Sequence, residues 1–260
     1  MRISCLQMDV ALGRAEENFA KAEAMIRQAM ADKPDVIVLP ETFNTGFCPE
    51  MAAAFADRDG KTTKAVIGGL AKEFSVNIVA GSVSNLREGK LYNTAMVFDR
   101  SGTCIASYDK THLFSHAGEE KTYTPGDHLC RFTLDGVSCG IIICYDVRFP
   151  ELTRSLAVAG LDVLFVVSQW PEARISHLRS LTVARAIENQ MFVVCCNACG
   201  KEGKSALGGN SAVIDPWGQT IVLATDKEKI LTADADLCIL SSIRDSIHVF
   251  RDRRPELYRL

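Results

Sequence analysis

Apolar residues along this chain fall into short continuous runs separated by amphipathic stretches. Phe19, Ala22, Ile26 and Met30 recur at helical spacing in one of these stretches, whereas the continuous runs are typical of buried strands. The pattern predicts strands at 3–8, 36–39, 76–83, 94–98, 105–108, 139–144, 162–167 and 192–196, with more strands after 211. It predicts helices at 15–30, 61–74, 150–159 and 174–190.

The order of these elements predicts the fold class. Continuous apolar strands indicate burial on both faces, and their alternation with helices places the helices outside the sheets. Turn signals at 87–90 and 215–218 indicate hairpins, so mixed sheets are expected rather than purely parallel ones. We therefore expect an α/β layered sandwich. Because no repeat, low-complexity tract or linker interrupts the pattern, a single domain over residues 1–260 is predicted.

Composition and charge exclude several classes of protein. The 29 basic and 32 acidic residues give a net charge of −3, which argues against a nucleic-acid partner that needs a basic surface. No apolar run approaches the roughly 20 residues that span a bilayer, so no membrane partner is expected. The N-terminus lacks the features of a signal peptide. The ten cysteines are therefore interpreted as reduced thiols in a cytoplasmic protein.

Three chemically active residues follow predicted strands. Glu41 follows the run 36–39, Lys110 follows 104–108, and Cys144 ends 140–143. Catalytic groups of α/β folds concentrate at the carboxyl ends of strands. A carboxylate that accepts the thiol proton, an ammonium that stabilises negative charge and a thiolate nucleophile together suit acyl transfer. Spacing alone leaves a structural cysteine as the alternative.

The sequence motifs around these residues resemble those of a known family. They are LPETF at 39–43, YDKTHLF at 108–114, ICYDVRFP at 143–150, QWP at 169–171 with Arg174, ARAIENQ at 184–190 and DRRPELY at 252–258. Their order and spacing resemble those of the nitrilase superfamily, the carbon–nitrogen hydrolases. The resemblance extends from the first predicted strand to the C-terminus.

The resemblance implies roles for individual residues. Glu41 resembles the general base of the family, Lys110 its catalytic lysine and Cys144 its nucleophile. A second glutamate is expected between the lysine and cysteine motifs, where spacing from Pro125–Gly126 favours Glu119 and leaves Glu120 as the alternative. The implied fold is a four-layer α–β–β–α sandwich. A homodimer or higher homo-oligomer is implied as well, paired through helices near the nucleophile and through the C-terminal tail, with no metal or organic cofactor.

Within the family, the motifs resemble the ω-amidase branch, whose members deaminate 2-oxoglutaramate or 2-oxosuccinamate. Such a substrate carries a second carboxylate, for which Arg148, Arg174 and His177 are candidate partners. Arg174 and His177 are about one helical turn apart and are expected to share a face, while Arg148 could equally anchor its own loop. The complete candidate substrate-binding set is Phe43, Tyr145, Arg148, Trp170, Arg174 and His177. Aliphatic amides, ureido compounds, deaminated glutathione and nitriles remain alternative substrates.

Other readings of the sequence compete with this one. A catalytically silent, small-molecule-binding member of the family is one, and a redox protein using Cys196 and Cys199 is another. We interpret that cysteine pair as core packing, because a zinc site would need a second ligand pair. His112 and His116 raise the possibility of a Cys–His dyad, but His112 is interpreted as ordering its loop. Further expectations are that Asn197 and Asn210 line the pocket and that the glycine-rich stretch 200–209 is a mobile loop.

Overall fold

The computed structural model describes residues 1–202 and 205–258 and arranges their strands in a seven-stranded, a six-stranded and a two-stranded sheet. The first sheet has the order β15-β1-β2-β4-β5-β6, and β3 pairs with β4. Neighbouring strands are parallel from β1 through β2 to β4 and antiparallel elsewhere along that order. Its strands are β1 (Arg2–Gln7), β2 (Val36–Val38), β3 (Asp57–Arg58), β4 (Asn77–Arg87), β5 (Lys90–Phe98), β6 (Cys104–Asp109) and β15 (Lys229–Asp234).

The second large sheet has the order β14-β13-β10-β9-β8-β7, with parallel pairing between β8, β9 and β10. The small sheet pairs β11 with β12. The strands of these two sheets are β7 (Arg131–Leu134), β8 (Val137–Ile143), β9 (Val163–Ser168), β10 (Phe192–Asn197), β11 (Cys199–Glu202), β12 (Ser205–Gly208), β13 (Ala212–Ile214) and β14 (Thr220–Leu223).

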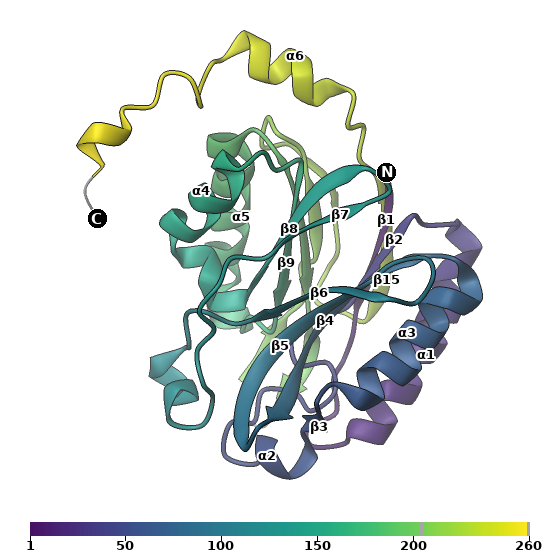
Figure 1. Ribbon diagram of the computed structural model, residues 1–260. Coiled ribbons are helices and arrows are strands. Elements are labelled where there is room, and N and C mark those ends of the chain that lie inside the picture. The colour runs from purple at the N-terminus through teal and green to yellow at the C-terminus, as the bar shows by residue number, and fades with distance from the viewer. Residues whose placement is uncertain (203–204, 259–260) are drawn as a thin grey trace.

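Helices cover the outer face of each large sheet. Figure 1 shows α1 (Ala15–Ala29) and α3 (Lys61–Phe74) side by side against the first sheet, and α4 (Pro150–Val158) and α5 (Ile175–Asn189) against the second. The short α2 (Ala52–Phe55) lies near β3. The helix α6 (Ile239–Ser246) leads into a C-terminal arm (Figure 1), and its Leu240 packs on the core between the two large sheets. This arrangement confirms the predicted four-layer α–β–β–α sandwich.

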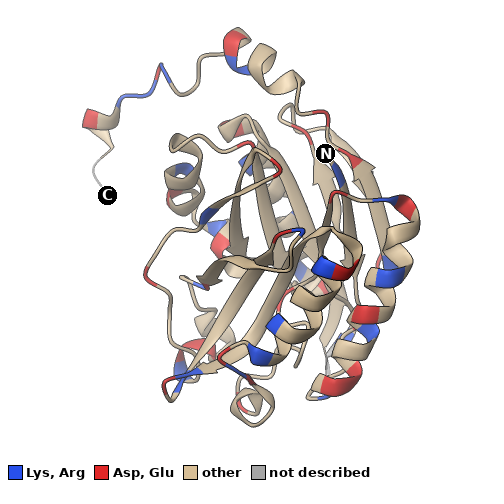
Figure 2. Ribbon diagram, turned by 45° about the vertical axis from the view of Figure 1, so that its right-hand side comes forward, with Lys and Arg blue, Asp and Glu red and all other residues tan. Residues whose placement is uncertain are grey.

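The hydrophobic core is divided by the layers. One cluster fills the space between the two large sheets and includes Val38, Val97, Ile141 and Phe165. A second cluster lies beneath α1 and α3, and a third beneath α4 and α5. Strands buried on both faces thus explain their continuous apolar runs. Charged residues gather on the outer faces of the helices and on the arm, while the strands between carry few (Figure 2).

The structure corrects some predicted elements. The stretch 200–209 forms most of the β11–β12 hairpin rather than a loop, although Gly203 lies outside the described residues. The helix predicted from 174 begins at Ile175, because Arg174 belongs to a preceding 3₁₀ turn (Glu172–Arg174). Among the described residues, no helix is long and apolar enough to cross a membrane.

Candidate active site

Glu41 lies in a tight turn after β2, where the backbone of β4 approaches closely. A Cβ atom at Gly81 would lie 1.9 Å from the carbonyl oxygen of Pro40, and Gly81 has a φ of +53°, so only glycine fits there. The Glu41 carboxylate is buried, with 1% exposure. Its Oε2 accepts the backbone N–H of Gln169 at 2.8 Å, and its Oε1 accepts Nδ2–H of Asn93 at 2.9 Å.

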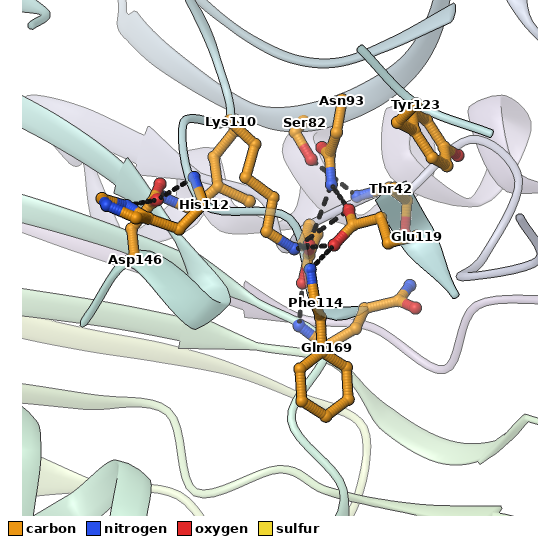
Figure 3. Close-up of polar contacts among 12 residues, drawn as sticks. Thr42, Ser82, Asn93, Lys110, His112, Phe114, Glu119, Tyr123, Asp146 and Gln169 are labelled. Atoms are coloured by element: carbon orange, nitrogen blue, oxygen red, sulfur yellow. Dashed lines mark hydrogen bonds and ion pairs between the residues drawn. The ribbon is translucent and has the colours of Figure 1, made fainter. Parts of the chain in front are cut away.

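Lys110 lies between two glutamates. Its Nζ donates to Glu41 Oε1 at 2.9 Å and to the two oxygens of Glu119 at 3.1 and 2.9 Å (Figure 3). Glu119 is held by the backbone N–H of Phe114, which donates to its Oε2 at 2.6 Å. Glu120 is exposed. Of the two glutamates that the sequence left open, Glu119 is therefore the one that contacts the lysine.

Cys144 lies at the point where β8 ends and a 3₁₀ turn (Cys144–Arg148) begins. Its φ of 48° is in the left-handed region, which costs a residue other than glycine about 1–3 kcal/mol. Cys144 nevertheless lines the same cavity as Glu41 and Lys110. The turn therefore presents the thiol to that cavity at the expense of local strain.

The electrostatics of the cluster follow from burial and charge. Burial, followed by the negative charge of Glu41, raises the pKa of the Cys144 thiol well above 9.0, although Lys110 opposes this shift. Burial alone would lower the pKa of Lys110, but Glu41 and Glu119 more than compensate and raise it. Burial also raises the pKa of Glu119, against the opposing effect of Lys110. The resting site thus holds a protonated thiol beside an ammonium group.

Asp146 connects the turn of the cysteine to the loop of the lysine. Its carboxylate accepts hydrogen bonds from the hydroxyl of Tyr108 at 2.8 Å and from the backbone N–H groups of His112 and Ile143 at 2.9 and 3.0 Å. The Nδ1 of His112 lies 2.9 Å from the same carboxylate (Figure 3). His112 therefore orders its loop, in agreement with its interpretation from the sequence. His116, in contrast, is exposed and lines the cavity.

The cavity has a volume of about 540 Å³ and extends from the cluster toward the surface. Arg148 lies 4.8 Å from the centre of the Trp170 ring, and Arg174 lies 5.5 Å from that of Phe114. Among the described residues, neither arginine forms an ion pair with a carboxylate. Tyr145 also lines the cavity. The wall thus carries two arginines and several aromatic rings together with Glu172, and the two guanidinium groups can bind a carboxylate.

Two predicted substrate-binding residues lie elsewhere. Phe43 is fully buried against Phe19, with 5.2 Å between ring centres, because the turn directs it into the core beneath α1. Phe47 occupies the cavity wall instead. His177 is exposed and contacts Arg148 through its Nδ1 at 3.2 Å, outside the cavity lining. Arg174 lines the cavity and His177 does not, so the two side chains do not share a cavity face.

Other residues singled out in the sequence have structural surroundings. Asn197 accepts the backbone N–H of Trp170 at 2.7 Å and so supports the cavity wall from behind. Asn210 lines a separate cavity of about 340 Å³ beside α5. Cys196 and Cys199 are both buried. Within residues 1–202 and 205–258, no cluster of histidine, cysteine, aspartate or glutamate side chains is arranged to hold a metal ion.

Sequence reasoning missed Gln169 and Phe47 as cavity residues. Gln169 directly follows β9, as Cys144 directly follows β8, and this position at the carboxyl end of a strand could have indicated a cavity residue. Phe47 lies in a turn-rich segment without periodicity, so no pattern distinguished it from Phe43. The missing information in both cases is which side chains face the cavity.

Comparisons with known proteins show the family to which the chain belongs. The family model described as carbon–nitrogen hydrolase matches residues 2–245. The chain is 41% identical to a 2-oxoglutaramate amidase of Bacillus subtilis, over 98% of both chains. It is 32% identical to the human omega-amidase NIT2, over 99% of this chain and 96% of that one.

A solved structure adds a chemical observation. A variant of the amidase from Nesterenkonia sp. AN1, 25% identical with a TM-score of 0.88, covers 99% of this chain and 95% of its own. That structure shows covalent addition of the acetamide moiety of fluoroacetamide at the active-site cysteine of the Nesterenkonia protein. From the family match, the curated relatives and the shared fold, we conclude that this chain is a carbon–nitrogen hydrolase of the nitrilase superfamily.

Proposed function

We propose that this enzyme hydrolyses the ω-amide of a 2-oxo dicarboxylic acid monoamide, 2-oxoglutaramate or 2-oxosuccinamate, through a thioester on Cys144. The observation that carries the proposal is the contact of Lys110 with both Glu41 and Glu119 in a cavity that Cys144 lines. Glu41 is the general base, Lys110 stabilises the negative charge on the substrate oxygen, and Glu119 holds the lysine. The relative in Bacillus subtilis that carries the name 2-oxoglutaramate amidase supports the choice of substrate.

In the first half of the reaction, the thiol proton moves from Cys144 to Glu41 as sulfur bonds to the amide carbon. The oxygen gains negative charge beside the ammonium of Lys110, which is more effective in this buried site than in water. The carbon–nitrogen bond then breaks, and the proton on Glu41 passes to the departing nitrogen, which leaves as ammonia. This step leaves an acyl thioester on Cys144.

In the second half, Glu41 takes a proton from a water molecule whose oxygen bonds to the thioester carbon. The carbon–sulfur bond breaks, the carboxylic acid leaves, and the proton returns to the thiolate. The raised pKa of Cys144 favours this return, because the thiol is the stable resting form.

The second carboxylate of the substrate is assigned to Arg148 and Arg174, because both line the cavity without a carboxylate partner among the described residues. Trp170 and Tyr145 also line the cavity. His177 is proposed to hold Arg148 in place through the 3.2 Å contact rather than to bind substrate.

An ammonia-release assay tests the proposal. The purified enzyme is given 2-oxoglutaramate, 2-oxosuccinamate, glutamine, an aliphatic amide and a nitrile at equal concentration. We expect the two 2-oxo amides to be hydrolysed fastest, and Cys144→Ala to abolish ammonia release. Cys104→Ala is the matched control, because Cys104 is also free and half-buried but lies on β6 outside the cavity. Faster turnover of the nitrile, full activity of Cys144→Ala or binding without turnover would contradict the proposal.

A homodimer is proposed as the working form. Val158 and Ile187 are exposed on the helices beside the cysteine turn, and Ile247, Leu257 and Tyr258 are exposed on the C-terminal arm. Their burial against a second copy would remove apolar surface from water. Light scattering of the purified protein measures its mass and checks this. A single domain and a cytoplasmic location stay predictions from the sequence, and limited proteolysis and cell fractionation check them.

A further inference from the structure

Gln169 presents an unused carboxamide to the cavity. The residue is only 6% exposed, lines the cavity, and has no hydrogen-bond partner for its Oε1 or Nε2 among the described residues. Leaving both polar atoms of a buried amide without a partner destabilises the folded protein. Such a group is typical of a site that receives its partner from a ligand.

The backbone of Gln169 is fixed beside the reacting groups. Its N–H donates to Glu41 Oε2 at 2.8 Å and also interacts with the thiol of Cys144. The next residue, Trp170, is held by the side chain of Asn197 at 2.7 Å. The Gln169 side chain therefore starts from a backbone that contacts both Glu41 and the thiol of Cys144, and it lines the same cavity as they do. In Figure 3 its carboxamide extends away from the amino group of Lys110.

The Glu41 carboxylate has too few free lone pairs to accept both N–H groups of a bound amide. Each oxygen of a carboxylate has two lone pairs. Those of Glu41 Oε1 are taken by Lys110 and Asn93, and Oε2 accepts one hydrogen bond from Gln169, which leaves one lone pair for the thiol proton. The –NH₂ group of a bound primary amide brings two more N–H donors. Asn93 Oδ1 is also unpartnered, but Asn93 does not line the cavity.

We propose that the Gln169 carboxamide accepts an N–H of the reacting amide and thereby makes the enzyme selective for primary amides over substrates without that N–H. This inference rests on the proposed thioester mechanism and names the group that recognises the nitrogen end of the substrate. A nitrile or an ester offers no N–H, so its binding leaves the acceptor of Gln169 unsatisfied. Sites that hydrogen-bond a substrate N–H discriminate strongly against analogues that lack it.

The test compares an amide and an ester that form the same acyl-enzyme, 2-oxoglutaramate and the 5-methyl ester of 2-oxoglutarate. Because hydrolysis of the thioester is common to both, the ratio of their kcat/KM values reports only on the nitrogen or oxygen that leaves. In Gln169→Leu, we expect kcat/KM for the amide to fall about 10- to 100-fold and that for the ester to change less than threefold. The melting temperature should be unchanged or higher, since the Gln169 side chain has no partner among the described residues.

Gln190→Leu is the matched control. Gln190 is another buried glutamine, but its Nε2 donates to the carbonyl oxygens of Ile243 and Ile247, far along the chain from the site. We expect this variant to lower the melting temperature and to leave the amide-to-ester ratio unchanged. An equal fall for amide and ester in Gln169→Leu, or no fall for either, would overturn the assignment of Gln169.

A failure of the proposed function can be distinguished from a failure of the role assigned to Gln169. A wild-type enzyme that hydrolyses neither substrate refutes the 2-oxo acid specificity, and the role of Gln169 is then decided by alkylation of Cys144. Chloroacetamide and chloroacetonitrile lose the same chloride to the same thiol but differ in the presence of an N–H. We expect Gln169→Leu to slow alkylation by chloroacetamide alone, and equal effects on both reagents would overturn the inference.

Discussion

The position of Glu119 predicts a specific loss of activity when its charge is removed. In Glu119→Gln, one of the two oxygens near Lys110 becomes an NH₂ group. If the remaining oxygen takes the place of Oε2, it still accepts from Lys110 Nζ and from the N–H of Phe114, which lie 2.9 and 2.6 Å from Oε2. The NH₂ group then takes the place of Oε1, where it faces two donors, Lys110 Nζ at 3.1 Å and Asn93 Nδ2 at 3.2 Å. In the opposite orientation the NH₂ group faces Lys110 and the N–H of Phe114 instead. At least one hydrogen bond to a charged group is therefore lost.

The size of the loss follows from that count. A hydrogen bond to a charged group contributes about 1.5–3 kcal/mol, which corresponds to about 10- to 150-fold in rate if the lysine is displaced from the substrate oxygen. Lys110 keeps its 2.9 Å contact with Glu41, so the variant should retain some activity. We expect kcat to fall about 10- to 150-fold while KM changes little, because the lost contact acts on the transition state.

Steady-state ammonia release measures this effect, and circular dichroism checks that the variant is folded. Glu120→Gln is the control, because that neighbouring side chain is exposed, and its kcat should stay within twofold of the wild-type value. If Glu119→Gln keeps more than half of the wild-type kcat, Glu119 does not hold the lysine for catalysis. If Glu120→Gln loses as much as Glu119→Gln, the effect belongs to the loop as a whole.

Three other predictions concern the surroundings of the site. The raised pKa of Cys144 predicts that the rate of its alkylation by iodoacetamide keeps increasing with pH through pH 9, because the thiolate fraction is still small there; a plateau below pH 8 would contradict this. Asp146→Asn should lower both the melting temperature and kcat, because a buried carboxylate that accepts several hydrogen bonds loses its charge. We expect the free energy of unfolding to fall by about 2–4 kcal/mol. Thermal denaturation measures the loss, and unchanged stability would contradict the role of Asp146 in connecting the two loops. Gly81→Ala should abolish activity or folding, since its Cβ would overlap the Pro40 carbonyl. Gly136→Ala meets only the strain of a φ of +84°, with open space around its Cβ, and should cost about 1–2 kcal/mol in unfolding free energy; equal effects would refute the packing argument.

Much of the fold was predictable because its determinants are local. Continuous apolar runs and helical spacing identified the layers, and the places where strands end identified Glu41, Lys110 and Cys144 as candidates. The family spacing then favoured Glu119, and the structure shows its contact with Lys110.

The remaining parts of the site depend on contacts between segments far apart in the chain. The approach of Gln169 to Glu41 spans 128 residues and has no local signature. Phe43 and Phe47 lie in the same turn-rich segment. Phe43 packs beneath α1 against Phe19, and this contact leaves Phe47 as the ring that faces the cavity. Arg174 and His177 are about one turn apart in the sequence, yet only Arg174 lines the cavity, which their spacing could not show.

The proposed catalytic groups come from opposite halves of the molecule. Glu41, Lys110 and Asn93 belong to the first sheet or the segments next to it, whereas Cys144 and Gln169 follow strands of the second. Neither half holds a complete set, so catalytic competence exists only after the two sheets have docked face to face. During refolding, recovery of activity should therefore lag behind recovery of secondary structure. The rate at which activity returns then measures the rate at which the two sheets dock.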